Sequence, residues 1–336
     1  MKELFKINLQ LFAELNTQTT LLKGEGNDLS AEMKTFYDMT LIDEASAELV
    51  HDQFGQKRPI PANGGKTIEF RKFSSLPKAT TALTEGVTPN GNKLNVSSIT
   101  ATVSQYGDYI VQSDILELTA LDNTILEATK LLGRQAGLTL DTVVRNVLIA
   151  GTNVNYCPKV GADGAETEVT SRSGLDATCK LTVKQIQKAV AKLRANNAKT
   201  INGDYVAIIH PYVAYDLMRD PEWIEAHKYA KPENLYTGEI GKVAGVRFVQ
   251  TSEAAILDGG VFCTLIIAEG AYGVTEITGG GLETIVKQKG SAGTGDPLNQ
   301  RSSVGWKALK TAERLVENYM IRIESKSEFS SSAAAN

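Results

Sequence analysis

The side chains that could do acid–base or nucleophilic chemistry are few and far apart in this chain of 336 residues. The three histidines, His51, His210 and His227, are scattered along it. None accompanies a Gly-x-Ser-x-Gly elbow or a comparable nucleophile motif. We therefore expect core or surface roles for all three histidines, and the sequence predicts neither a catalytic residue nor an enzyme.

Metal and phosphate sites are equally poorly supported. Cys157, Cys179 and Cys263 form no Cys-x-x-Cys pair, and an odd number of cysteines is typical of a reducing compartment rather than a disulfide framework. Gly65-Lys66-Thr67 resembles the end of a P-loop, but Ile60 stands where such a loop requires its first glycine. We therefore expect neither a metal nor a cofactor.

The charge balance excludes a surface built to neutralise nucleic-acid phosphates. The chain has 35 Lys and Arg against 39 Asp and Glu, a net charge of -4, and no long basic run. No segment approaches the roughly 18 to 20 apolar residues of a membrane helix, so no membrane partner is expected. Asn8 and Gln10 interrupt the apolar run near the start, which argues against a secretory signal.

The elements that must position these side chains begin with a helical pattern from Ser30 to Phe54. Two alternating runs, residues 67–71 and 99–104, then predict β-strands. Residues 74–93 between them contain turn signals and few residues fit to pack a core. We expect a two-stranded ribbon with a projecting tip. An isolated ribbon is only marginally stable in water, so a neighbouring subunit is a natural partner for it.

A long helix is predicted from Ser113 to Ala150, with Gly151 ending it. Gly133 and Gly137 inside it should each cost about 0.5 to 1 kcal/mol relative to alanine, which indicates a close backbone contact. Its predicted apolar face is Leu118, Leu121, Ile125, Ala128, Leu132, Ala136, Leu140, Val143 and Val147.

A compact α/β module is expected after a hairpin or loop at residues 152–180. A capping box at residues 182–185 predicts the start of a helix, residues 205–209 read as a buried strand, and Pro211 suits the first turn of another helix. Further strands are predicted at residues 246–249, 262–268, 282–287, 303–311 and 319–324.

Three stretches, residues 81–114, 122–153 and 296–325, resemble one subfamily of the major capsid proteins of tailed bacteriophages. They begin "TALTEGVTPNGNK", "DNTILEATKLLGR" and "DPLNQRSSVGWKA". The resemblance implies an α+β fold, the capsid fold first described for phage Hong Kong 97. It also implies that the chain self-assembles into hexamers and pentamers, which form the icosahedral head shell around double-stranded DNA in the virion.

The resemblance further implies a division of the chain into segments. These are an N-terminal arm at residues 1–57, an extended β-hairpin loop at 58–108, a peripheral domain with a spine helix at 109–151, an axial domain at 152–280, a return to the peripheral domain at 281–326, and a disordered tail at 327–336. Candidate contacts between subunits in the extended loop are Arg71, Lys72, Lys78, Glu85 and Lys93.

Other copies of the chain are the first expected partner. The short N-terminus leaves little room for a scaffolding segment, so a separate scaffolding protein is expected, together with a portal protein. Packaged DNA would be contacted without sequence preference, and assembly would take place in the cytoplasm of the host bacterium.

Residues 8–13, "NLQLFA", resemble an N-terminal extension that a host cysteine protease removes in Firmicutes, from a ribosomal protein and from some phage capsid and scaffold proteins. Cleavage would follow Ala13 and leave Glu14 as the new N-terminus. The simpler interpretation is an apolar arm segment that docks on a neighbour. For the whole chain, an encapsulin-like compartment shell and an enzyme or binding protein with an unrecognised site stay open as alternatives.

Overall fold

The computed structural model describes residues 39–45, 49–73, 76–83, 85–88, 91–119, 124–228, 241–291, 296–330 and 333–336. The chain divides into two compact units. The first unit comprises residues 1–44, 107–133 and 283–307, and the second comprises residues 45–106, 134–282 and 308–336. The candidate processing site, Ala13 and Glu14, lies outside the described residues.

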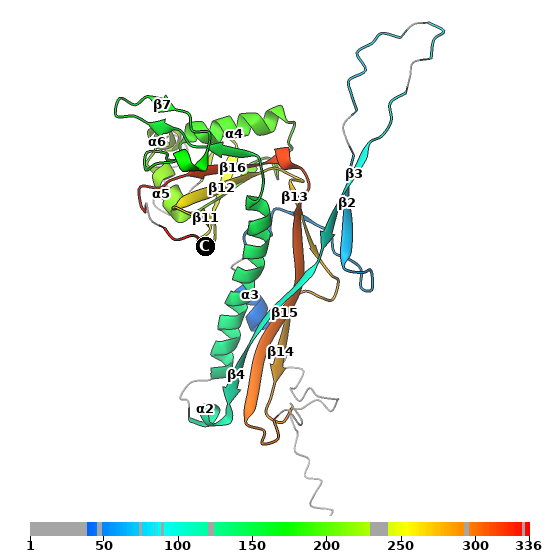
Figure 1. Ribbon diagram of the computed structural model, residues 1–336, viewed down its shortest axis with the longest axis vertical. Helices are drawn as coiled ribbons and strands as arrows, with labels where there is room; N and C mark the ends of the chain where they lie inside the picture. Colours follow the sequence, from blue (N-terminus) through cyan, green and yellow to red (C-terminus); the bar gives the residue numbers. More distant parts are fainter. Residues whose placement is uncertain are drawn as a thin grey trace, which may run out of the picture. The chain divides into compact units, whose positions relative to one another are not determined.

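Helices occur together with antiparallel and mixed sheets, and strands β9 to β16 follow one another with no α-helix described between them, which confirms the predicted α+β fold class (Figure 1). They are β1 (Gln56–Lys57), β2 (Thr67–Phe73), β3 (Val96–Thr102), β4 (Ser104–Ser113), α2 (Asp114–Thr119), α3 (Thr124–Ile149), β5 (Val154–Tyr156), β6 (Lys159–Val160), β7 (Glu166–Thr167), α4 (Val183–Ala195), β8 (Tyr205–Ile209), α5 (Pro211–Met218), α6 (Pro221–Lys228), β9 (Lys242–Val243), β10 (Val246–Gln250), β11 (Ile256–Leu257), β12 (Val261–Ile267), β13 (Tyr272–Glu276), β14 (Glu283–Lys287), β15 (Arg301–Arg314) and β16 (Met320–Ser325). Residues 39–45 are also helical.

A seven-stranded mixed sheet forms the core of the second unit, in the order β5-β16-β12-β8-β10-β9, with β11 paired to β12. Every residue of β8 and β12 is buried, as expected for short continuous apolar runs covered on both faces. Helices α4 and α5 contribute apolar side chains to the same core. We refer to this sheet and its helices, residues 152–268 together with β16, as the seven-stranded module.

Helix α4 begins at the predicted residue but is capped differently from the prediction. The Thr182 side chain makes no capping hydrogen bond, so the predicted capping box is wrong. Instead, the backbone N–H of Val183 donates to Asp220 Oδ2 at 2.8 Å. Gln185, the other member of the predicted box, is buried. A carboxylate near a helix N-terminus also suits the helix dipole, so Asp220 replaces the local cap.

The predicted long helix is observed as α2 and α3, while residues 120–123 between them are not described. The buried stripe of α3 steps by four, through Ala128, Leu132, Ala136, Leu140, Val144 and Leu148. The predicted face is wrong at Leu118, which is 81% exposed. Val143 and Val147, also predicted on this face, are partly buried, and Val147 packs against the core of the second unit. The close contact at Gly133 is confirmed, because a Cβ there would lie 2.8 Å from the Leu41 carbonyl oxygen.

A second sheet is built on the long strand β15, which continues from the first unit into the second. Within the first unit, β15 pairs with β14, antiparallel, and with β4. Within the second unit it pairs antiparallel with β13, and β13 pairs in parallel with β1. Antiparallel partners on β15 therefore come from both units.

Described residues of the predicted disordered tail, 327–336, make contacts with the rest of the second unit. Phe329 stacks on Tyr212 with ring centroids 4.3 Å apart, and Ser327 is 1% exposed. The Asn336 side chain accepts a hydrogen bond from the Ile256 N–H at 2.9 Å. These contacts lie within the second unit. The proposed division of the whole chain into arm, loop and domains stays a prediction.

Candidate subunit-contact surface

The imidazole rings of two of the three histidines make hydrogen bonds in the described structure. His51 is buried, and its Nδ1 lies 2.6 Å from Asp141 Oδ2. Asp141 Oδ1 also accepts the backbone N–H groups of Val50 and His51. His210 Nδ1 accepts the Tyr212 N–H at the start of α5, and burial lowers the pKa of His210. The His227 side chain is not among those described.

The cysteines lie in environments that suppress reactivity. All three are free thiols and buried, and burial raises the pKa of Cys263 to about 12. A thiol with so high a pKa carries almost no thiolate near neutral pH. Within the described ranges, no three His, Cys, Asp or Glu side chains are grouped as metal ligands would be, and no described helix is long and apolar enough to cross a membrane.

The predicted two-stranded ribbon is present as β2 and β3. They pair antiparallel from Thr67 opposite Thr102 to Phe73 opposite Val96. Near its base the ribbon is anchored by Phe70, which is 3% exposed and lies under the Arg58 guanidinium. A Cβ at Gly273 would lie 2.7 Å from the Phe70 ring, so the absence of a side chain at Gly273 makes room for this ring.

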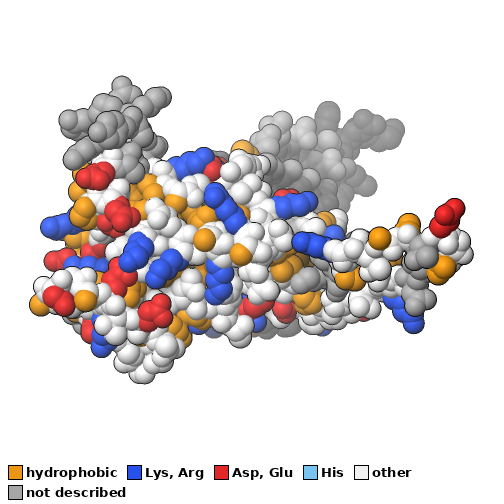
Figure 2. Space-filling model, turned by 90° about the horizontal axis from the view of Figure 1, so that it is seen from above, with side chains coloured by type: hydrophobic (Ala, Val, Ile, Leu, Met, Phe, Trp, Pro, Cys, Tyr) orange, Lys and Arg blue, Asp and Glu red, His pale blue; other side chains and the backbone are white. Residues whose placement is uncertain are grey.

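Burial ends beyond that anchor. Every described residue from 76 to 98 is exposed, and the described residues before β3 belong to no helix and no strand. Large apolar side chains are among them, namely Leu76 (55% exposed), Leu83 (77%), Val87 (63%) and Leu94 (68%). We call residues 76–95 the loop tip. In Figure 1 it closes the ribbon of β2 and β3, and in Figure 2, where it lies at the right, orange and charged side chains are mixed along it.

The charged residues predicted as subunit contacts lie along this ribbon and its tip. Arg71 is exposed in β2 opposite Ser98, and Lys78, Glu85 and Lys93 are exposed in the loop tip. Within the described part of the chain, none of these four side chains lies at ion-pair distance from an opposite charge. The backbone of Lys72 pairs with Ser97, and its side chain is not described.

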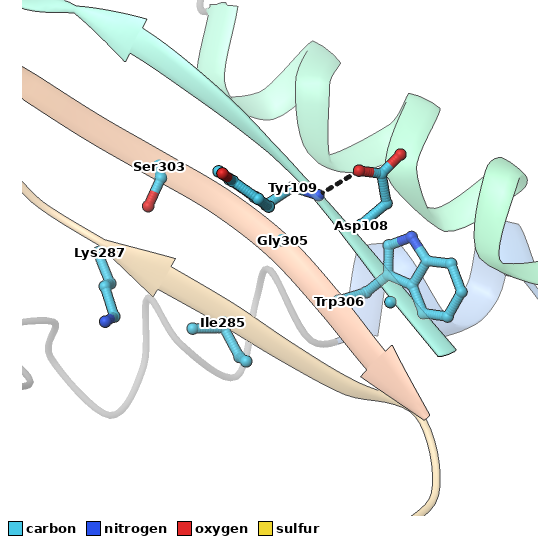
Figure 3. A pocket seen from close by; sticks show the side chains of 8 residues that line it. Asp108, Tyr109, Ile285, Lys287, Ser303, Gly305 and Trp306 are labelled. Atoms are coloured by element: carbon cyan, nitrogen blue, oxygen red, sulfur yellow. Dashed lines mark hydrogen bonds between the residues drawn. The ribbon is translucent and has the colours of Figure 1, made fainter. Parts of the chain in front are cut away.

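A second surface, not predicted from the sequence, lies on the sheet of the first unit. Gly305 stands opposite Ile285 in β14, and a Cβ at Gly305 would lie 2.7 Å from the Tyr109 Cβ. Gly305 therefore lets β4 approach β15 closely, and beside them lies a hollow of about 370 Å³ lined by Tyr109 and Ile285, with Ser303 and Lys287 at one end (Figure 3). Tyr109 is 69% exposed beside it. Only the strand register brings these residues together, so no local sequence signal could have identified them.

Exposed apolar side chains are also frequent elsewhere in the first unit. In α2, Ile115, Leu116 and Leu118 are 67%, 46% and 81% exposed, although the helix has only six residues. Surfaces of this kind typically mark contacts with another protein.

A protein-family model matches the greater part of the chain. The family model described as "Phage capsid protein" matches residues 96–317, which is more than half of the chain. A comparison with curated protein sequences found no match.

Solved structures match over most of the chain. The capsid protein of the cyanophage P-SCSP1u superposes with a TM-score of 0.64 at 14% identity, over 83% of this chain and 89% of its own. That of the cyanophage Pam1 gives a TM-score of 0.63 at 13% identity, over 84% of this chain and 92% of its own. The capsid of Ralstonia phage GP4 gives 0.61 at 13% identity, over 85% and 90%.

These matches confirm the resemblance to phage major capsid proteins that residues 81–114, 122–153 and 296–325 indicated. At such low identity the solved structures establish the shared fold, and the family match supplies the relationship. The chain therefore belongs to the phage capsid protein family and has the Hong Kong 97-like capsid fold.

Proposed function

We propose that this chain is the subunit that self-assembles into hexamers and pentamers and closes the icosahedral head shell around the double-stranded DNA of a tailed phage. The observation that carries the proposal is the loop tip, where all described residues, apolar ones included, are exposed. Burying the four exposed large apolar side chains of this loop lowers the free energy of the system, and this requires another surface that covers them. A neighbouring copy supplies such a surface at every position of a closed shell.

The proposal assigns roles to the segments of the chain. The extended loop at residues 58–108 lies over the next subunit, with Arg71, Lys72, Lys78, Glu85 and Lys93 at the contact. The other segments form the arm, the peripheral domain and the axial domain predicted above. A separate scaffolding protein, a portal protein and non-specifically held DNA complete the assembly, which takes place in the host cytoplasm before the subunit becomes part of the virion.

The test is assembly of the purified full chain, followed by sedimentation and negative-stain microscopy, with and without scaffolding protein. The triple substitution Leu83→Ser, Val87→Ser and Leu94→Ser should abolish closed particles and leave the unfolding temperature of the subunit within about 2 °C of the parent. The matched control is Ile224→Ser, at a 40% exposed apolar position in α6. Normal particles from the triple variant, or a parent chain that stays small under every condition, would contradict the proposal.

Processing after Ala13 is a separate part of the proposal. Intact-mass measurement of the subunit from virions should give the mass of a chain beginning at Glu14. The Ala13→Asp variant should retain its first thirteen residues, because a charged group replaces the small side chain at the cut. A full-length subunit in virions of the unmodified phage would contradict processing and leave the assembly proposal intact.

A further inference from the structure

An open groove lies beside the edge of the seven-stranded sheet, far in sequence from the loop tip. One wall is β5, which ends the strand order of the sheet, and the other is helix α4. The groove has a volume of about 470 Å³. It lies entirely within the second unit.

The edge strand offers unpaired backbone groups to this groove. On its paired side, the Asn153 carbonyl oxygen accepts the Arg322 N–H of β16, and the Cys157 N–H donates to the Glu324 carbonyl oxygen. Successive backbone groups of a strand point to opposite edges, so the N–H and C=O of Tyr156 lie on the open side. An extended segment could therefore pair with β5 as an additional strand.

The helix wall of the groove is basic. Helix α4 contains Lys184, Lys188, Lys192 and Arg194, and it contains no acidic residue. Lys188 and Lys192, one turn apart, line the groove, and Lys192 Nζ lies 3.3 Å from Asn155 Oδ1. Glu168 is the one carboxylate among the lining residues that are described.

A third feature of the groove is an unsatisfied polar group. Gln185, one turn before Lys188, also lines the groove and is 6% exposed. Its Nε2 atom has no hydrogen-bond partner among the described residues. A buried amide without a partner is costly, and a bound segment that shifts the side chain slightly would supply an acceptor.

We propose that the acidic N-terminal segment of a second copy, residues 14–38, docks in this groove. The segment has five acidic residues, Glu14, Glu25, Asp28, Glu32 and Asp38, and two basic ones, Lys23 and Lys34, for a net charge of 2 − 5 = −3. None of it belongs to the described structure. Its 25 residues can span about 80 Å when extended, which is enough to reach a neighbouring copy. The inference rests on the proposed self-assembly, because it assigns one contact between copies.

Zero-length cross-linking of assembled particles tests the contact directly. Equal amounts of ¹⁴N- and ¹⁵N-labelled full chain are assembled together, and a carbodiimide then joins amines to carboxylates in ion pairs. Mass spectrometry should find Lys188 or Lys192 joined to acids of residues 14–38, with mixed isotope labels that identify two different copies. In the same particles, hydrogen exchange at Tyr156 should be slower than in the unassembled chain.

A charge exchange provides the matched variants. Lys188→Glu with Lys192→Glu should raise the concentration needed for assembly about tenfold, since two ion pairs are replaced by repulsion. Adding Asp28→Lys and Glu32→Lys should restore most of the assembly. Lys184→Glu, on the same helix but paired with Glu166 outside the groove, should leave the cross-links in place.

Four results would overturn the inference. Particles without cross-links between residues 14–38 and Lys188 or Lys192, or with cross-links that carry only one isotope, would remove this contact and leave the assembly proposal standing. Failure of the Asp28→Lys and Glu32→Lys substitutions to restore assembly would also rule out this contact and leave the assembly proposal standing. A chain that forms no particles at all would overturn both proposals.

Discussion

The seven-stranded module and the extended loop are two regions of one chain with opposite relations to solvent. Every residue of β8 and β12 is buried, and the module carries most of the buried apolar side chains of its unit. Every described residue of the loop tip is exposed. The module thus buries its apolar side chains within the subunit, while the apolar side chains of the loop tip can be buried only by contact with another surface.

This difference shows which apolar side chains stabilise the folded subunit and which can stabilise association with a partner. Burial of apolar area contributes about 25 cal/mol per Å², and burying a leucine or valine side chain contributes about 1.5 to 3 kcal/mol. In the module this contribution stabilises the folded subunit. In the loop tip the same contribution is made only on contact with a partner. Substitutions in the module should therefore change the stability of the subunit, and substitutions in the loop tip should change assembly.

The largest effect is expected from removing the loop tip. Replacing residues 74–95, which include the loop tip, by an Asn-Gly turn would connect Phe73 to Val96 through that turn. These two residues already stand opposite each other in the ribbon. We expect closed particles to disappear in sedimentation, while the thermal unfolding of the subunit changes little. A shell that still closes would show that the loop tip is dispensable and that the contrast with the module has no role in assembly.

A core truncation in the module should have the opposite signature. Phe262→Ala removes a fully buried ring from β12 and should lower the free energy of unfolding by about 3 to 5 kcal/mol, measured by urea denaturation of the unassembled chain. Leu83→Ala, its control in the loop tip, should change that free energy by less than about 0.5 kcal/mol. Similar losses for both would erase the distinction between the two regions.

Substitutions at the ribbon base, around Phe70 and Gly273, should lower the stability of the subunit, as substitutions in the module do. The boundary between the two regions therefore lies between this base and the loop tip. Gly273→Ala places a Cβ 2.7 Å from the Phe70 ring and should destabilise the subunit by about 1 to 3 kcal/mol in the same denaturation measurement. Gly281→Ala is the matched control, because a Cβ there meets no atom within 4 Å. If Gly273→Ala proved neutral, Phe70 would not be the anchor of the ribbon.

The smallest effect concerns how the module holds α4. Asp220→Ala removes the carboxylate that accepts the Val183 N–H, and we expect a loss of about 1 kcal/mol, measured by urea denaturation. Thr182→Ala should cost less than about 0.5 kcal/mol, because the Thr182 side chain makes no capping bond. The reverse order would favour the capping box that the sequence predicted.

Much of the fold follows from local patterns. The alternating runs at residues 67–71 and 99–104 correctly predicted the ribbon, and the apolar runs at 205–209 and 262–268 correctly predicted β8 and β12. These patterns are readable because the period of side-chain burial reflects the geometry of the element itself. The buried stripe of α3 was predicted only in part, since Val144 and Leu148, which are fully buried, were not among the predicted residues.

The candidate surfaces were predictable only where one segment carries them. Residues 74–93 contain turn signals and few residues fit to pack a core, so an exposed loop could be expected there from the sequence alone. The hollow beside Gly305 joins Tyr109 and Ile285, which are 176 residues apart. No period or motif connects them, because the register of β15 with its neighbours sets their distance.

The sequence by itself determined the class of the fold, the ribbon with its exposed loop, and the membership of a capsid family, because these depend on local periodicity and on extended similarity. The tertiary structure decided which side chains stand next to each other. Asp220 caps a helix 37 residues earlier in the chain, and Gly273 makes room for Phe70. Both contacts depend on packing between distant segments, and packing is fixed only when the whole unit has folded.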